Sequence, residues 1–186
     1  MAATNLRNGV DVDRLGELVR RLKEDPGAGI VKCEARSRWE GGLRTHTEVS
    51  YWWRDGARDD RARAHTIEAD SPEALLGGDA GPTPIELVLA ALGSSLAVGV
   101  AAQAAQRGVK LEALELNVQG DFDIRMLFGA TERVHPGLQV VRVKMTAKAD
   151  ASDQVLAEIK EAAERSSPVC NTLTRPVKVI ATLARG

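Results

Sequence analysis

The sequence predicts an α+β fold whose elements follow in the order helix, three strands, long helix, two strands, helix, strand. Three observations carry this prediction. Apolar residues recur at three- and four-residue steps in two segments, alternate with polar residues in several others, and fill one long segment on every side. The chain has 186 residues and no internal repeat, so we expect one domain with a short extension.

The N-terminal segment predicts an amphipathic helix over 11–25, stopped by Pro26-Gly27. Its apolar stripe consists of Val12, Leu15, Leu18, Val19 and Leu22. We therefore divide the chain into an N-terminal helical extension, 1–28, and a single α+β domain, 29–186. The start of the chain has no charged segment followed by an apolar run, so we expect no signal peptide and a cytoplasmic location.

Three strands are predicted next, over 29–39, 43–53 and 58–69. Turn residues at 39–42 and 54–56 separate them, so the segment predicts an antiparallel meander with one solvated face. Residues 70–82 contain Gly77, Gly78 and Gly81 and predict a loop.

The best-defined element is a helix over 84–107. Thr83 can cap it, Pro84 suits the first helical position, and Glu86 can complete a capping box. Between positions 87 and 102 the only polar side chains are Ser94 and Ser95, so we predict a buried core helix. Its many Ala and Gly residues favour close packing over membrane insertion. Since the chain has few other helices to cover it, we predict a two-fold homodimer with the two long helices at its centre.

After Gly108 the pattern changes to a period of two and predicts strands over 114–122 and 138–149. A helix follows over 152–165, and Pro168 ends it. The last predicted strand covers 177–183.

Composition narrows the functional class. The 25 basic and 26 acidic residues give a net charge of −1, and aromatic residues make up 3% of the chain, so we expect no nucleic-acid or membrane partner. The two cysteines, Cys33 and Cys170, are far apart, and the three histidines are scattered. We therefore expect reduced thiols, no metal site and no cofactor.

Several motifs resemble those of the OsmC/Ohr family of thiol-dependent hydroperoxide reductases. They are the segments GPTPIELVLAALGSSLAVGVAAQAAQRGVKLEALELNVQGDFD, HPGLQVVRVKM, SSPVCNTLTRPVKV and RWEGGLR. The resemblance covers about 29–186 and implies an intertwined homodimer, with antiparallel sheets wrapped around two central buried helices. It also implies a role in oxidative stress, with a peroxide-like or small apolar ligand.

The resemblance implies chemistry on a pair of cysteines, and this chain has serine at both positions. A thiolate on the central helix, where the family reads A-L-G-x-C, attacks the peroxide, and a second cysteine resolves the sulfenic acid. Those positions are Ser95 and Ser167 here. A serine hydroxyl stays un-ionised and forms no counterpart of the sulfenic acid, so we expect the usual peroxidase reaction to be absent. Ser95 is then either a hydroxyl in a ligand site or a small residue that lets helices approach.

The resemblance also implies an arginine that stabilises the reactive group and a carboxylate that orients it. Arg38 and Arg44 flank the Gly41-Gly42 turn and are candidates for ligand binding, with Arg36 left open. Glu86 is the candidate carboxylate, although the capping box explains it without any chemistry.

Cys170 provides the alternative hypothesis, an active reductase with a displaced thiol. It lies three positions after Ser167 in the sequence, close to the family's second cysteine. The competing interpretation is a small buried hydrophobe. A third alternative is a purely structural dimer whose pocket has closed.

Overall fold

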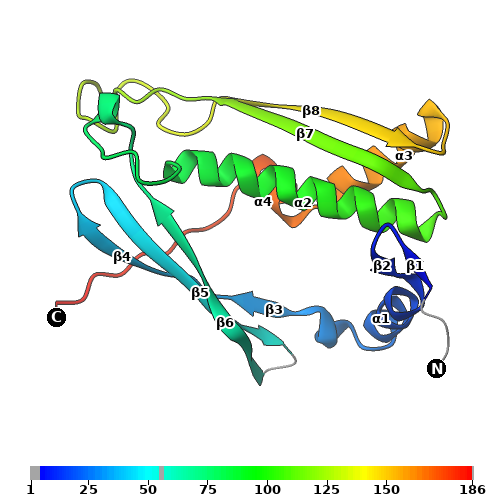
Figure 1. The fold of residues 1–186 in the computed structure, drawn as a ribbon. Helices are drawn as coiled ribbons and strands as arrows, with labels where there is room; N and C mark the ends of the chain where they lie inside the picture. Colours follow the sequence, from blue (N-terminus) through cyan, green and yellow to red (C-terminus); the bar gives the residue numbers. More distant parts are fainter. Residues whose placement is uncertain (1–4, 55–56, 186) are drawn as a thin grey trace. The chain divides into compact units, whose positions relative to one another are not determined.

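The computed structural model describes residues 5–54 and 57–185. These form two units: the first contains Asp11–Val88, and the second contains the residues from Leu89 onward together with Arg7–Val10. The predicted α+β class with antiparallel sheets is confirmed (Figure 1). The division into an extension, 1–28, and one domain, 29–186, stays a prediction.

The described part of the chain starts with a small hairpin that the sequence analysis missed. Strands β1 (Leu6–Arg7) and β2 (Val10–Asp11) are joined by Asn8 and Gly9, whose φ angles are 51° and 76°. Two consecutive positive φ angles are typical of a type I′ turn, and Asn-Gly is its strongest sequence signal. The predicted first helix is confirmed as α1 (Val12–Glu24), capped by the Asp11 side chain, and a short 3₁₀ turn, Pro26–Gly29, follows.

The predicted meander is confirmed as a four-stranded antiparallel sheet in the first unit. Its strands are β3 (Val31–Cys33), β4 (Arg36–Gly41), β5 (Arg44–Arg54) and β6 (Ala57–Ala69). Strand β5 pairs with β6 along most of its length, and also with β4 and β3, which together replace the single strand predicted over 29–39. In the predicted turn at 54–56, Asp55 and Gly56 lie outside the described residues.

The long apolar helix is α2 (Pro84–Gln106), preceded by a 3₁₀ turn, Glu73–Leu75. The single chain covers only part of this helix, and its complete burial by a second copy stays a prediction. Leu92, Leu96, Val100, Ala104 and Ala105 are buried, but Val98 is 70% exposed. In the second unit, β7, β8 and α3 cover one side of this helix, which leaves the face around Val98 open.

In the second unit, α2 packs against a β-ribbon and against the helix that follows this ribbon in the chain (Figure 1). The ribbon is β7 (Leu111–Asp121) paired with β8 (Val140–Ala149), and the helices α3 (Asp153–Ser166) and α4 (Pro168–Thr174) follow. A Cβ on Gly93 would lie 3.3 Å from the Val118 side chain, and one on Gly99 would lie 3.1 Å from the Cβ of Ala163. Glycines on α2 therefore allow the close packing that the sequence predicted.

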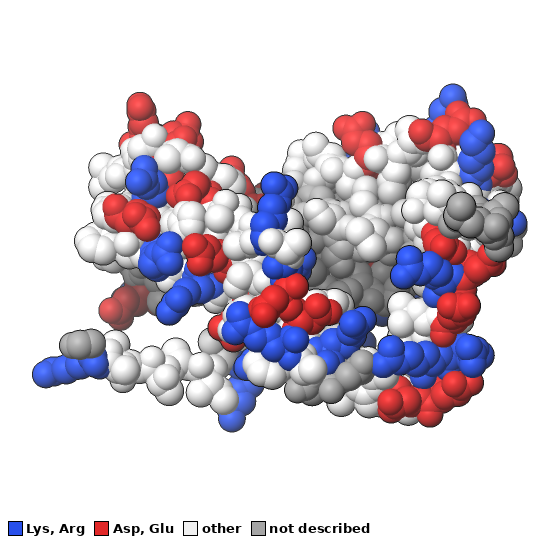
Figure 2. All heavy atoms as spheres, turned by 60° about the horizontal axis from the view of Figure 1, so that its bottom comes forward, with Lys and Arg blue, Asp and Glu red and all other residues white. Residues whose placement is uncertain are grey.

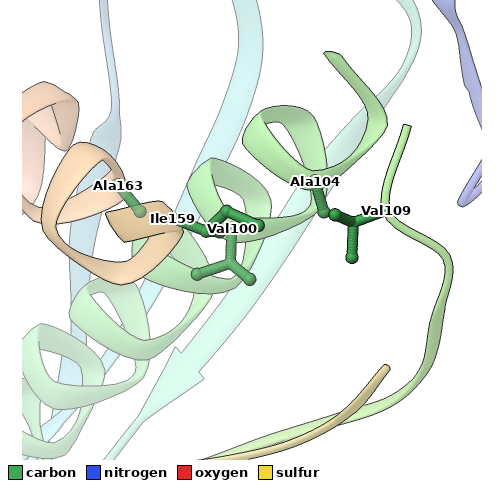
Figure 3. Close-up of a cluster of buried hydrophobic side chains, with 5 residues drawn as sticks. All are labelled: Val100, Ala104, Val109, Ile159 and Ala163. Carbon is green, nitrogen blue, oxygen red and sulfur yellow. The ribbon is translucent and has the colours of Figure 1, made fainter. Parts of the chain in front are cut away.

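A hydrophobic cluster forms the core of this unit. Val100 and Ala104 of α2 pack against Ile159 and Ala163 of α3 (Figure 3). Val109, two residues before β7, completes the cluster. Ile159 is 1% exposed, and Leu114 and Met145 of the ribbon pack against the cluster.

The C-terminal part differs from its prediction in two ways. Helix α4 was not predicted, although Ser167-Pro168 is a cap followed by proline at the first helical position. The strand predicted over 177–183 does not form: these residues have no regular structure and are exposed throughout, Leu183 by 97%. A strand needs a neighbouring strand for its main-chain hydrogen bonds, and the single chain pairs none with this segment.

Charged side chains of both signs are interspersed over the face shown in Figure 2. Within the described residues, α2 alone is long and apolar enough to cross a membrane by length and composition. The core helix of a soluble protein satisfies the same two criteria.

Candidate functional site

The two serines singled out from the sequence meet inside the second unit. The Oγ atoms of Ser95 on α2 and Ser167 at the end of α3 are 2.8 Å apart, a hydrogen bond between positions far apart in the chain. Ser167 is 2% exposed and Ser95 is partly buried. A direct bond to a neighbouring hydroxyl offsets the cost of burying each polar group.

Local structure fixes the orientation of Ser167. Its Oγ accepts a hydrogen bond from the backbone N–H of Cys170 at 3.1 Å, which makes it the N-cap of α4. The Asn171 side chain donates to the Ser167 carbonyl oxygen at 2.8 Å and also to carbonyls at the end of α3. The serine pair thus lies where α2 meets the junction of α3 and α4.

Cys170 lies in the first turn of α4 and is half-buried. Its backbone N–H donates a hydrogen bond to the Ser167 Oγ. Cys33 belongs to β3 in the first unit, opposite Trp52 of β5, and is exposed. Both thiols are free. The structure therefore places one cysteine in the helical turn that Ser167 caps.

Glu86 performs the capping role expected from the sequence. Its Oε2 accepts hydrogen bonds from the Thr83 backbone N–H at 2.7 Å and the Thr83 hydroxyl at 2.8 Å, and the Glu86 N–H donates to the Thr83 Oγ1 at 3.3 Å. The Thr83 N–H and hydroxyl lower the pKa of Glu86, because both bonds favour the ionised carboxylate. The capping box explains these contacts of Glu86.

Arg38 and Arg44 lie on the β4–β5 hairpin of the first unit, on either side of the turn. Arg38 is opposite His46 in the sheet, and its guanidinium lies 3.6 Å from the Glu48 carboxylate with about half of its side chain exposed (51%). His46 in turn contacts Glu68 through its Nδ1. Arg36, the candidate left open, is opposite Glu48. The serine pair belongs to the second unit, whereas these arginines and Glu86 belong to the first.

Asp70 is a buried polar residue that the sequence analysis missed. It is 3% exposed, and its carboxylate accepts hydrogen bonds from the backbone N–H groups of Ser71, Gly78 and Ala80. These bonds, that of Ser71 first, lower the pKa of Asp70, and the charge of Arg44 adds to the effect. In the sequence, an aspartate directly before a glycine-rich loop could have indicated this site. In the structure, the Asp70 carboxylate holds the loop that precedes α2.

Two cavities lie elsewhere in the second unit. One, of about 380 Å³, is a polar depression lined by Glu115, Asn117, Gln119, Lys144 and Thr146. The other, of about 270 Å³, lies between β8 and α3 with Val100 in its lining. Neither is lined by Ser95 or Ser167. Over 5–54 and 57–185, no three His, Cys, Asp or Glu side chains are placed to hold a metal ion.

Comparison with solved structures shows the same fold in bacterial proteins of low sequence identity. An OsmC-like protein from Mycoplasma pneumoniae is 14% identical, with 77% of this chain and 87% of that chain covered and a TM-score of 0.55. An OsmC-like protein of unknown function from Vibrio cholerae is 16% identical, with 76% and 92% covered and a TM-score of 0.54. An organic hydroperoxide resistance protein OsmC from Legionella pneumophila is 19% identical, with 76% and 88% covered and a TM-score of 0.51.

None of the curated proteins compared with the chain matches it. The family model for the OsmC-like protein matches residues 77–182, which is more than half of the chain and includes α2, the β-ribbon, both serines and Cys170. With a family match of this extent and the shared fold, the chain belongs to the family of OsmC-like proteins.

Proposed function

We propose that this protein is a cytoplasmic OsmC-like homodimer of the oxidative stress response, which lacks the thiol peroxidase reaction and keeps a small-molecule site at the dimer interface. The observation that carries the proposal is the hydrogen bond between Ser95 and Ser167, which is 2.8 Å long and partly buried. It joins the two positions where the resemblance expects the reactive and the resolving cysteine.

The chemistry of serine supports the loss of activity. Reduction of a hydroperoxide by a thiolate breaks the O–O bond, releases an alcohol and leaves a sulfenic acid on sulfur. A second thiol then forms a disulfide and releases water, and an external dithiol restores both thiols. An alcohol oxygen has no corresponding oxidation step, and its proton stays bound at neutral pH. Two hydrogen-bonded hydroxyls can instead bind a polar atom of a ligand.

The surface of the single chain supports a second copy as the partner. Helix α2 leaves an apolar face around Val98 open to water, and the 177–183 segment exposes Val179, Ile180 and Leu183 by 86%, 74% and 97%. Exposed clusters of large apolar side chains are typical of protein interfaces. A two-fold axis beside α2 would cover both copies of this face at once.

Arg38 and Arg44 are the proposed ligand-binding cations of the site, with Glu86 as an accompanying carboxylate. The Arg38 guanidinium is half exposed and meets Glu48 only at 3.6 Å, so its donors can still bind an oxygen ligand in bidentate geometry. Glu86 has the weaker support, since Thr83 already occupies its Oε2 atom. The ligand class is small and either apolar or peroxide-like.

A second candidate function is a working hydroperoxide reductase that uses Cys170. The hydrogen bond from the Cys170 backbone N–H to the Ser167 Oγ favours it, because it places Cys170 in the turn that Ser167 caps. In this alternative the Cys170 thiolate would take the peroxide oxygen, and a reductant thiol would resolve the sulfenic acid. The third candidate, a purely structural dimer, would leave the serine pair without any ligand.

Thiol titration after one equivalent of an organic hydroperoxide separates these functions. Wild type, Cys170→Ser and the double variant Ser95→Cys/Ser167→Cys are compared by free thiol content and by intact mass. We expect no rapid loss of thiol in wild type and rapid loss of two thiols, as a disulfide, in the double variant. Rapid loss in wild type that disappears in Cys170→Ser would replace our proposal with the Cys170 reductase. No reaction in a folded double variant would show that the serine pair does not occupy the peroxidase positions.

The dimer is tested by sedimentation of the wild type and Val98→Asp. A charge at the open face of α2 should dissociate the dimer, because an unpaired carboxylate is costly to bury. Val140→Asp, at an exposed valine of β8, is the matched control and should sediment like wild type. A monomeric wild type would contradict the homodimer.

A further inference from the structure

Within the second unit, the side chain of the hairpin residue Asn8 is hydrogen-bonded to the segment that leads from α2 into β7. Asn8 Nδ2 donates to the Val109 carbonyl oxygen at 2.9 Å, and Asn8 Oδ1 accepts from the Leu111 backbone N–H at 2.9 Å. The amide thus imitates a neighbouring strand at the start of β7. Beside it, Arg7 reaches Gly108, where an added Cβ would lie 2.6 Å from the guanidinium.

This contact lies at the edge of the hydrophobic core. Val109 is 8% exposed and belongs to the cluster with Val100 and Ile159. Its carbonyl group and the Leu111 N–H flank the point where the chain leaves α2 and enters β7. Both groups need hydrogen-bond partners at this partly buried position, and Asn8 supplies them together.

Asn8 is also followed by Gly9, and this dipeptide has an intrinsic reactivity. Glycine has no side chain to hinder its backbone nitrogen, so that nitrogen can attack the preceding asparagine amide more easily than any other residue's can. The chain has three other asparagines, each followed by a larger residue: Asn5, Asn117 and Asn171. Asn8 therefore combines the most reactive local sequence with a structural role for its amide.

We propose that Asn8 is a deamidation site, that docking on Val109 and Leu111 protects it, and that its conversion undocks the N-terminal hairpin. In the reaction the Gly9 backbone nitrogen loses its proton and bonds to the Asn8 Cγ, and the side-chain amide leaves as ammonia. Water then opens the cyclic imide to aspartate or isoaspartate. Water is the only co-reactant, and no atom is oxidised or reduced.

Docking protects Asn8 because both polar atoms of its amide are engaged. While Nδ2 and Oδ1 bind Val109 and Leu111, the amide is held toward β7 and cannot turn to meet the Gly9 nitrogen. The reaction then proceeds only from molecules whose hairpin has opened locally.

Deamidation replaces an attractive contact with β7 by a repulsive one. The product has no N–H group to donate to Val109, and its negative carboxylate would face the carbonyl oxygen of that residue. The Leu111 N–H keeps an acceptor, but the paired arrangement is lost. Helix α1 begins directly after the hairpin, and the Val12 N–H bonds to the Asn5 carbonyl at 3.0 Å. Undocking is therefore expected to loosen the start of α1 as well.

Peptide mapping by mass spectrometry tests the site and its protection. The full chain is incubated at mildly alkaline pH, once folded and once in denaturant, and the amide-to-acid conversion is followed at all four asparagines. We expect Asn8 to react fastest in denaturant and at least about tenfold more slowly in the folded protein, as opening-limited chemistry requires. Equal rates in the two conditions would overturn the protection, and a rate no higher than that of Asn117 in denaturant would overturn the site.

Hydrogen exchange of Asn8→Asp tests the consequence. We expect faster amide exchange over residues 6–15 and at Leu111, while the core around Ile159 exchanges as in wild type. Asn117→Asp is the matched control, since it makes the same chemical change at an exposed residue of β7, away from the hairpin. Wild-type exchange in Asn8→Asp, or the same increase over residues 6–15 in Asn117→Asp, would refute the undocking. The aged wild-type protein provides an independent readout, because its deamidated fraction should exchange like Asn8→Asp.

Discussion

The two units of the chain are stabilised in different ways. The second unit has a hydrophobic core in which α2 and α3 meet through Val100, Ile159 and their neighbours (Figure 3). In the described part of the first unit, the only buried hydrophobic residues are Ala28 and Ala69. Its sheet is held by main-chain pairing along β5 and by buried Asp70 at the loop that follows.

Three neighbouring aromatic side chains of β5 in the first unit each contact a cation. Lys32 lies 5.6 Å from the ring centre of Trp53, Arg54 lies 5.5 Å from that of Trp52, and Arg58 lies 3.8 Å from that of Tyr51. Such contacts stabilise exposed sites by about 0.5–1 kcal/mol each. Because only the second unit has such a hydrophobic core among the described residues, the two units should respond unequally to the same substitution.

The largest expected effect comes from truncating an isoleucine in each unit. Ile159→Ala in α3 removes a side chain that is 1% exposed and should lower the free energy of unfolding by about 2–5 kcal/mol. Ile67→Ala in β6 makes the same chemical change at a half-buried position and should cost less than half as much. Urea unfolding of both variants measures the difference. Equal costs would show that the sheet of the first unit is as well covered as the core.

A smaller effect is expected from filling a tight place in the loop before α2. In Gly77→Ala the new Cβ would lie 1.8 Å from the Ser71 carbonyl oxygen, so the backbone must move. We expect a loss of roughly 1–3 kcal/mol, the usual range for overpacking. Gly16→Ala is the control, since nothing lies within 4 Å of that site on α1, and should stabilise the helix by roughly 0.5–1 kcal/mol. Thermal unfolding compares the two. A neutral Gly77→Ala would contradict the role of this loop packing.

The smallest expected effect is a change in the acid dependence of stability in Asp70→Asn. Backbone N–H groups hold the pKa of Asp70 below its ordinary value of 3.8. The stabilisation is therefore complete above that ordinary value and is lost as the pH falls through the lower, folded-state pKa. The variant should be less stable than wild type at neutral pH, and the difference should shrink in acid.

Chemical unfolding at a series of pH values checks this prediction. Asp79→Asn is the matched control in the same loop, because Asp79 is exposed and asparagine tolerates its φ of 54°. A constant difference between Asp70→Asn and wild type at all pH values would rule out ionisation of Asp70 as the cause.

Local sequence patterns determined most of the elements of this fold. The period of 3.6 residues located α1 and α3, strict alternation located β7, and the Thr83–Glu86 spacing located the start of α2 with its capping box. These features depend on residues close together in the chain, so they can be read without the tertiary structure. The Asn8-Gly9 turn belongs to the same class and could have been predicted.

Only the tertiary structure decided which of these residues meet. It joined Ser95 to Ser167, enclosed Asp70 in backbone donors and placed Asn8 against the start of β7, all contacts between residues distant in sequence or held by a loop. It also left Val98 on an open face and 177–183 without a strand partner, although their patterns predict burial and pairing. The physical reason is that apolar periodicity specifies a face to be covered, while the covering surface belongs to another segment that the local sequence does not identify.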